Sequence, residues 1–226
     1  MRVLKITIAR AIWLFPLTDI NPKGKAIDTD LIEWLKKTYQ FQKYPASAFD
    51  FDSENKTLTF AGGRFKSGYE KDGSELYIGV GLSIYTDGLV ANTTSSTSDS
   101  ERFLDEALNS AVKELGLSPP EKIRKKLFVS EMDVHLDKPL SLLNPKLENL
   151  ARRISELRLE DPKVVFAFAG ISFLAEPEAQ SKLSPFHIER KINTDWSENR
   201  YYTRAPLQTE AHLKLLEELE ATLLVQ

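Results

Sequence analysis

The sequence contains no cysteine and has only three histidines and two methionines in 226 residues. Without cysteine the chain forms no disulfide, no thiolate metal site and no cysteine nucleophile. This absence fits a reducing compartment, so we expect a cytoplasmic protein. The formal net charge of −3 argues against a chain-wide nucleic-acid surface but leaves a local basic patch open.

Long hydrophobic runs are also missing. No stretch approaches the roughly 18 uncharged apolar residues that a membrane-spanning helix needs. The apolar run at residues 11–17 is broken by Pro16 and leads into Thr18 and Asp19 without a small-residue cleavage site. This pattern argues against a signal peptide, and we expect no membrane partner.

The common catalytic and cofactor motifs are absent too. The chain has no Gly-x-Ser-x-Gly elbow, no phosphate-binding Walker loop and no Gly-x-Gly-x-x-Gly fingerprint. We therefore predict no cofactor, and a binding role is favoured over an enzymatic one.

What is present is ordinary globular patterning, with 42% hydrophobic and 28% charged residues. Period-two alternation and helical spacing, each bounded by turn residues, mark the predicted elements. Strands are predicted over residues 3–15, 57–66, 76–85, 89–92, 128–136, 164–174 and 186–192 and from Tyr201 to the stop at Pro206, and helices from Asp28 or Thr29, Ser98, Asn144 and Thr209.

Local signals refine the stretch from residue 76 to residue 117. Asp87-Gly88 between two apolar runs predicts a type I′ hairpin turn. Ser98 with Glu101 three residues later predicts a helix N-cap, and Gly116 predicts the helix end. The paired glycines Gly62-Gly63 predict a β-bulge or a close backbone approach in the preceding strand.

The second half of the chain has three burial predictions. The run at residues 164–174 is the most continuously apolar, so it predicts a central strand covered on both faces. The spacing of Leu147, Leu150, Ile154 and Leu157 predicts a buried helix stripe. His212 lies beside apolar positions of the last helix, where a structural role is expected.

These elements predict an α+β fold with an antiparallel sheet and helices mainly on one face. The whole chain is predicted to form one compact domain. Its element order resembles saddle-like repeated α+β folds and allows two βαββα-like repeats side by side, with halves 1–117 and 122–226. Residues 16–22 match residues 139–145 at four of seven positions. Chance similarity between short motifs is the alternative explanation.

The best candidate for chemistry is the alternating set Glu131, Asp133, His135 and Asp137. Alternate residues of a strand share one face, and carboxylates with an imidazole can bind a divalent metal or transfer protons. A nuclease would add a Glu-x-Lys element, which occurs at Glu189 to Lys191 and again at Glu54 to Lys56. An ordinary solvated strand face explains the same pattern.

Basic and aromatic residues of the second half form a second candidate. A sheet face with arginine and tyrosine can bind nucleic acid through phosphate contacts and stacking. The candidate residues are Lys125, Lys126, Arg190, Lys191, Arg200, Tyr201, Tyr202 and Arg204. A solvated surface is again the alternative.

The leading hypothesis is a non-enzymatic module that binds a protein partner, or a second copy of itself, through a sheet face or edge. The missing catalytic motifs, the antiparallel patterning and the expected exposure of Tyr201 and Tyr202 support it. The alternatives are a metal-dependent hydrolase or nuclease centred on Asp133, His135 and Asp137, and a nucleic-acid-binding module.

Overall fold

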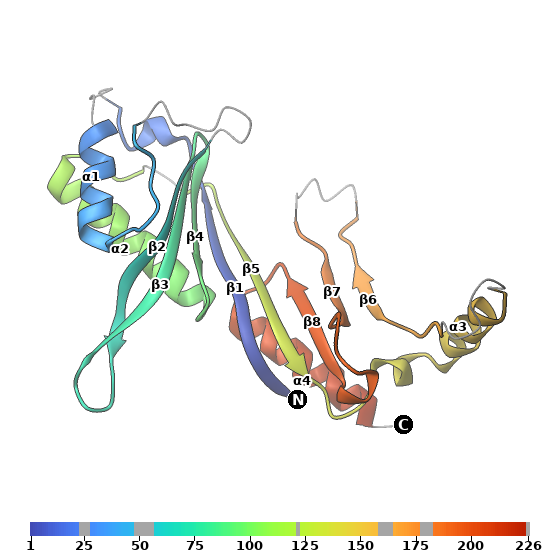
Figure 1. The fold of residues 1–226 in the computed structure, drawn as a ribbon. Helices are drawn as coiled ribbons and strands as arrows, with labels where there is room; N and C mark the ends of the chain where they lie inside the picture. The colour runs from blue at the N-terminus through green and yellow to red at the C-terminus, as the bar shows by residue number, and fades with distance from the viewer. Residues whose placement is uncertain (23–27, 48–56, 121–122, 158–164, 177–182, 225–226) are drawn as a thin grey trace. The chain divides into compact units, whose positions relative to one another are not determined.

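The computed structural model describes residues 1–22, 28–47, 57–120, 123–157, 165–176 and 183–224. In these ranges the elements follow the same order twice (Figure 1). The first run is β1 (Arg2–Leu14), η1 (Leu17–Asp19), α1 (Asp28–Tyr39), β2 (Thr57–Tyr69), β3 (Glu75–Tyr85), β4 (Gly88–Thr93) and α2 (Thr97–Leu115). The second is β5 (Lys125–His135), η3 (Leu140–Leu143), α3 (Pro145–Leu157), β6 (Gly170–Phe173), β7 (Phe186–Arg190), β8 (Arg200–Ala205) and α4 (Thr209–Leu224), with η5 (Trp196–Glu198) before β8.

The described strands form one hydrogen-bonded sheet in the order β2-β3-β4-β1-β5-β8-β7-β6. Pairing is antiparallel between β2 and β3, β3 and β4, β4 and β1, β6 and β7, and β7 and β8. The α+β class with an antiparallel sheet is therefore confirmed. A true duplication with halves 1–117 and 122–226 remains a prediction.

The chain divides into two compact units. The N-terminal unit comprises residues 8–130 and 207–209, and the C-terminal unit comprises residues 1–7, 131–206 and 210–226. Each is described by itself below. In the described part of the chain, no helix is long and apolar enough to cross a membrane.

In the N-terminal unit, α1 and α2 both cover the same face of the strands (Figure 1). Ile32 and Leu35 of α1 join Phe103 and Leu104 of α2 in one buried cluster with the strand residues. The small side chain of Ala9 in β1 lets α2 approach closely, and Ser100 Oγ donates a hydrogen bond to its carbonyl at 2.7 Å.

In the C-terminal unit, α4 covers one face of the strands. Leu216 and Leu223 of α4 are buried against Met132, Val134 and Ile188 of the sheet. His212 is fully buried, and its Nε2 lies 3.0 Å from Thr203 Oγ1. Its expected structural role is therefore confirmed.

The hairpin turn between β3 and β4 differs from the prediction. Tyr85 pairs with Gly88, so the two turn residues are Thr86 and Asp87. None of the three residues from Thr86 to Gly88 has the positive φ that a type I′ turn requires. Gly88 is instead needed because a Cβ there would collide with the carbonyl of Trp13 on β1.

The start of α2 is also two residues earlier than predicted. The N-cap is Ser96, whose side chain accepts a hydrogen bond from the backbone N–H of Asp99 at 3.0 Å. Several serines and threonines precede the helix, so the capping signal fits more than one of them. The predicted helix end is confirmed, because Gly116 adopts the left-handed conformation with φ 64°.

The Gly62-Gly63 prediction is confirmed on both counts. The β2–β3 register shifts between Phe60 and Gly63, which marks a bulge, and Gly62 has φ 68°. A Cβ on Gly63 would collide with the ring of Phe41.

The predicted central strand at 164–174 is wrong. Residue 164 lies outside the described residues, residues 165–169 form no strand, and β6 covers only Gly170–Phe173 at the end of the sheet. Phe173 and Leu174 are 62% and 78% exposed. An unbroken apolar run indicates that burial is favourable, but it does not indicate what provides the cover.

Two buried threonines exchange side-chain and backbone hydrogen bonds in the N-terminal unit. The N–H of Thr97 donates to Thr209 Oγ1 at 3.0 Å, and the N–H of Thr209 donates to Thr97 Oγ1 at 2.9 Å. Each hydroxyl thus satisfies an N–H at a helix start that lacks an intrahelical partner.

We predict that Thr209→Val lowers the free energy of unfolding by about 1–3 kcal/mol, because it leaves the buried N–H of Thr97 without an acceptor. Urea unfolding measures this loss. The matched control is Thr222→Val on the exposed part of α4, where a change below about 0.5 kcal/mol is expected. Equal effects of the two substitutions would contradict the assignment.

Candidate binding surfaces

The alternating residues of β5 lie on the sheet face opposite the buried Met132 and Val134, and each has its own partner. Glu131 accepts a hydrogen bond from the hydroxyl of Tyr202 at 2.6 Å and pairs with Arg204 at 3.4 Å. Asp133 pairs with Lys191 at 2.5 Å. The Glu131 contacts link β5 to the neighbouring strand β8, and the Asp133 contact reaches Lys191, which directly follows β7.

The last two residues of the set lie at the end of β5. His135 Nδ1 is 3.8 Å from Asp137, and Asp137 is also 3.6 Å from the N-terminal ammonium, which bonds mainly to Glu220. Among the described residues, no group of three or more histidine and acidic side chains could hold a metal ion. The metal site therefore remains a prediction without geometric support. The second Glu-x-Lys match, Glu54 to Lys56, lies outside the described residues.

Tyr202 is the titratable group most affected by these contacts. Partial burial raises its pKa above the ordinary value of 10.0, and its hydrogen bond to the Glu131 carboxylate raises the pKa further. The tyrosine is therefore held neutral as a hydrogen-bond donor.

Most of the predicted basic residues of the second half are also engaged. Lys126 pairs with Glu101 at 2.7 Å and lies over the ring of Trp13, Lys191 is held by Asp133, and Arg200 pairs with Glu198 at 2.9 Å. Arg204 pairs with Glu131, and Arg190 donates to the carbonyl of Trp196 at 2.8 Å. Lys125 is exposed.

The expected exposure of the Tyr201-Tyr202 pair is wrong for Tyr201. Consecutive strand residues face opposite sides, so Tyr201 enters the α4 core and is 1% exposed. Its hydroxyl accepts a hydrogen bond from the N–H of Leu140 at 3.1 Å, which holds η3 against the core. The contacts engage most of the candidate residues, Lys125, Lys126 and Arg200 stay exposed, and a binding role for this set remains a prediction.

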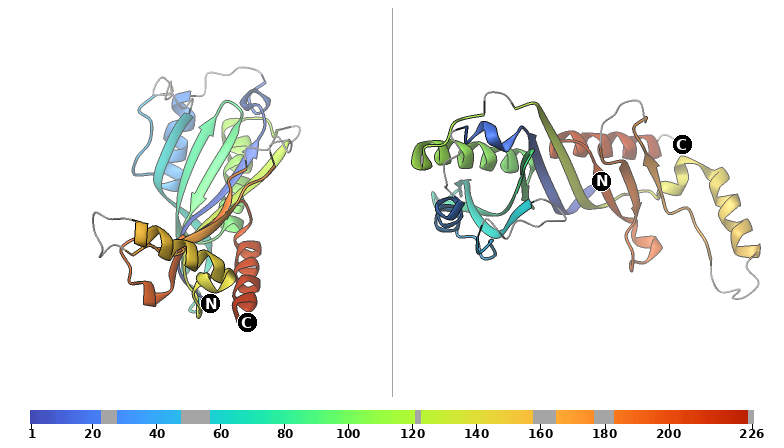
Figure 2. Two further views of the ribbon diagram at one scale, coloured as in Figure 1. Left: turned by 90° about the vertical axis from the view of Figure 1, so that its right-hand side faces the viewer. Right: turned by 90° about the horizontal axis from the view of Figure 1, so that it is seen from above.

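The predicted buried stripe of α3 is wrong. Leu150, Ile154 and Leu157 are exposed, with Leu157 at 64%, and Ala151 is the residue of α3 that is buried. The helix lies beyond the edge strand β6 rather than over the sheet (Figures 1 and 2). Its apolar spacing is real, but the described part of the C-terminal unit provides no cover for it.

A second uncovered apolar surface lies on β6 itself. The ring of Phe173 is 5.9 Å from that of Phe186, which in turn is 6.1 Å from buried His212. Phe173 therefore lies on the α4 side of the sheet. Leu174 after the strand is also an exposed apolar residue, as are Val165 and Phe166 before it. We call α3's stripe (Leu150, Ile154, Leu157) and this strand surface (Phe173, Leu174) the α3–β6 surface.

The N-terminal unit shows how such surfaces are normally covered. There the edge strand β2 has Phe60 and Phe65 on its helix side, and both are buried in the cluster that contains Ile32 and Leu35 of α1. α1 and α3 occupy the same place in the two runs, between the first and second strands. The apolar side of α1 is packed, whereas that of α3 is exposed. Sequence reasoning recognised the apolar residues of the α3–β6 surface but not their exposure, since α1 and α3 have similar patterns.

We call the sheet face of the N-terminal unit opposite α1 and α2 its open face. This face carries a set of charged and aromatic side chains that sequence reasoning missed. Arg64 lies over the ring of Tyr77 at 4.6 Å, and Lys66 lies 2.6 Å from Glu75 and 4.3 Å from the centre of the Tyr69 ring. The alternation of Arg64 and Lys66 with the apolar Phe65 in the sequence could have indicated this polar side of the strand.

Glycine and asparagine continue this open face toward β1. Gly79 pairs with Arg64, and no atom lies within 4 Å of where its Cβ would be. Arg10 Nε donates to Asn92 Oδ1 at 2.6 Å on the neighbouring strands. The result is a surface of low relief with exposed tyrosine and arginine.

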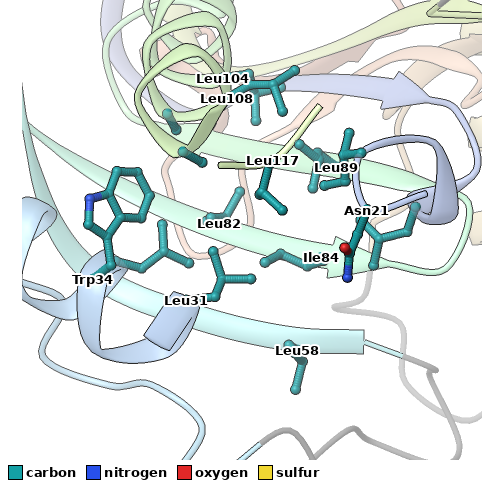
Figure 3. Close-up of a pocket in the computed structure, with 15 residues that line it drawn as sticks. Asn21, Leu31, Trp34, Leu58, Leu82, Ile84, Leu89, Leu104, Leu108 and Leu117 are labelled. Atoms are coloured by element: carbon teal, nitrogen blue, oxygen red, sulfur yellow. The ribbon is translucent and has the colours of Figure 1, made fainter. Parts of the chain in front are cut away.

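An apolar pocket of about 160 Å³ lies between the two helices and the strands of the N-terminal unit (Figure 3). Leucine, isoleucine and alanine side chains from η1, α1, α2 and β2 to β4 form most of its wall. Trp34 and Asn21 stand at opposite ends of the labelled side chains.

Comparisons with known proteins give no family. No family model matches the chain, and no curated protein matches it. The solved structure of Methanococcus jannaschii TBP aligns with 98% of this chain and 97% of that chain, with a TM-score of 0.43 and 12% sequence identity. A likeness at this level assigns neither a family nor a function.

We predict that Glu131→Gln lowers the pKa of Tyr202 toward its ordinary value, because the carboxylate no longer favours the protonated phenol. Burial keeps the pKa above 10.0. Absorbance titration of phenolate formation measures the change, and Tyr202→Phe identifies the group that titrates. An unchanged titration in Glu131→Gln would contradict the assigned hydrogen bond.

Proposed function

We propose that the protein is a non-enzymatic assembly module that binds a second copy of itself through the α3–β6 surface. The observation that carries the proposal is the exposed stripe of α3 next to an edge strand whose apolar side is equally exposed. Large contiguous apolar patches on soluble proteins mark sites of protein interaction.

A second copy is the occupant that this surface fits best. The surface contains both parts of a contact that α1 and β2 make inside the N-terminal unit: a helix stripe and the apolar side of an edge strand. Two copies related by a two-fold axis can exchange these parts, so that α3 of each covers β6 of the other. One association then buries the α3 stripe and the β6 residues of both copies.

The segments on either side of α3 have one contact each that leaves its apolar stripe exposed. After the helix, the N–H of Phe166 donates to Ser155 Oγ on α3 at 2.8 Å. Before the helix, Leu140 of η3 is buried and its N–H bonds to Tyr201. These contacts anchor η3 and join the following segment to α3, while the stripe stays available to a partner.

The charges on α3 do not oppose such a contact. Arg152 and Arg153 both pair with Glu156, at 2.8 and 3.1 Å. Glu156 offsets one of these two positive charges, and Leu150, Ile154 and Leu157 are the part of the helix that gains from losing water.

We predict that the protein is dimeric in sedimentation velocity at micromolar concentration, and that Ile154→Glu with Leu157→Glu weakens the dimer by on the order of 100-fold. The reason is that each carboxylate would be buried without a partner on association. Both residues are exposed in the single chain, so the variant is expected to keep its fold.

The matched control is Ile192→Glu, an exposed apolar residue of the same unit that follows β7 at the end away from Phe186. It is expected to leave the dimer intact. A wild-type protein that stays monomeric up to 100 times the working concentration, or a dimer that the α3 substitutions leave unchanged, contradicts the proposal.

A second candidate function is single-stranded nucleic-acid binding by the open face of the N-terminal unit. The observation that favours it is the grouping of Arg64 and Lys66 with Tyr77 beside the bare strand position of Gly79. Exposed aromatic rings stack with bases, while the cations contact phosphates.

For this candidate we predict that Arg64→Ala with Lys66→Ala weakens binding of a fluorescent oligonucleotide and reduces the salt slope of log K by about 1.4, since each phosphate contact on a single strand contributes roughly 0.7. Anisotropy titrations at several salt concentrations measure both. Lys214→Ala on the exposed side of α4 is the control and should change neither. Binding that is absent or independent of salt rejects the candidate.

A further inference from the structure

We infer that the apolar pocket of the N-terminal unit is a binding site for a small uncharged molecule, of the size of one aromatic ring or an alkyl chain of similar volume. This inference does not depend on the assembly proposed above, because the pocket is formed within residues 17–117 of one chain. It rests on the shape, lining and origin of the pocket.

The size of the pocket limits the ligand. Its volume of about 160 Å³ matches an engineered apolar cavity of roughly 150 Å³ that binds benzene. A second ring would require the walls to move. The ligand is thus a compact group, such as a single ring or a short chain.

The lining determines the chemistry of the ligand. Leu31, Leu82, Ile84 and Leu104 contribute aliphatic wall, and no charged side chain of the described residues lines the pocket. Water placed there finds few hydrogen-bond partners, so an apolar ligand displaces it at little cost. Asn21 provides an amide at one end, which suits a single hydroxyl or carbonyl on the ligand (Figure 3).

The pocket arises from small residues on α2. Ala107 and Ala111 face it from that helix, where larger apolar side chains would fill the space. At the other end, the indole N–H of Trp34 donates to Glu114 at 2.9 Å. This hydrogen bond joins the Trp34 ring, which lines the pocket, to α2.

The direct test is a titration of the wild-type chain with toluene, followed by the methyl resonances of Leu31, Leu82 and Leu104 in NMR spectra and by thermal unfolding. We expect saturable shifts at these methyl groups and a rise of the unfolding temperature of on the order of 2 °C or more. The absence of saturable methyl shifts overturns the inference. 1-Hexanol tests an alkyl ligand and is expected to shift the same methyl resonances. Benzylammonium is charged and is expected not to bind. Binding of benzylammonium as strong as that of toluene overturns the assigned chemistry.

A pocket-filling variant locates the site. Ala111→Leu is expected to abolish the toluene shifts and to leave the unfolding temperature equal or higher, while the control Ala221→Leu, on the exposed side of α4, keeps both toluene effects. If Ala111→Leu does not fold, Ala107→Val is the smaller filling substitution, with a partial loss expected. Full toluene binding by the folded filling variants overturns the location.

Discussion

An amphipathic helix is stable in water mainly because something covers its apolar stripe, and this requirement organises the molecule. In the N-terminal unit α1 and α2 lie together over one sheet face and bury the aromatic side chains of β2. In the C-terminal unit α4 covers the sheet, whereas α3 lies beyond β6 with Ile154 and Leu157 exposed. One element order thus gives two different degrees of closure, and this difference is the basis of the proposed assembly.

The polar contacts support this division between closed and open surfaces. The β5 face that carries Glu131 and Asp133 is occupied by its own ion pairs and hydrogen bonds with Tyr202, Arg204 and Lys191. Such pairs tie β5 to β8 and to the residue that follows β7. The apolar surfaces are the opposite case, because neither the pocket beside α2 nor the α3 stripe is filled by the described chain. The proposed self-association and the proposed ligand pocket therefore depend on hydrophobic contacts more than on charge.

Much of the fold was predictable from sequence because the signals were local. Gly116 ends a helix, Gly62 marks a bulge, and each of the four helices was expected near its observed start. Errors arose where several residues offered the same signal, as in the serine-rich segment before α2, or where the answer depended on distant contacts. Apolar spacing in α3 and residues 164–174 indicated that burial is favourable, but only the three-dimensional arrangement reveals that the cover is missing. The pocket was likewise not predictable, since it results from alanines on α2 facing residues of η1, α1 and three strands.

Inter-chain disulfide formation tests the central claim most directly, because the natural chain contains no cysteine. One preparation carries only Ile154→Cys and another only Phe173→Cys, and the two are mixed in equal amounts and oxidised gently. If α3 of one copy covers β6 of the other, the main product joins one chain of each kind, because a disulfide forms only where the two Cα atoms come within about 7 Å. No mixed product, together with a within-chain disulfide when both substitutions are made in one chain, would show that α3 closes on its own sheet and would contradict the account.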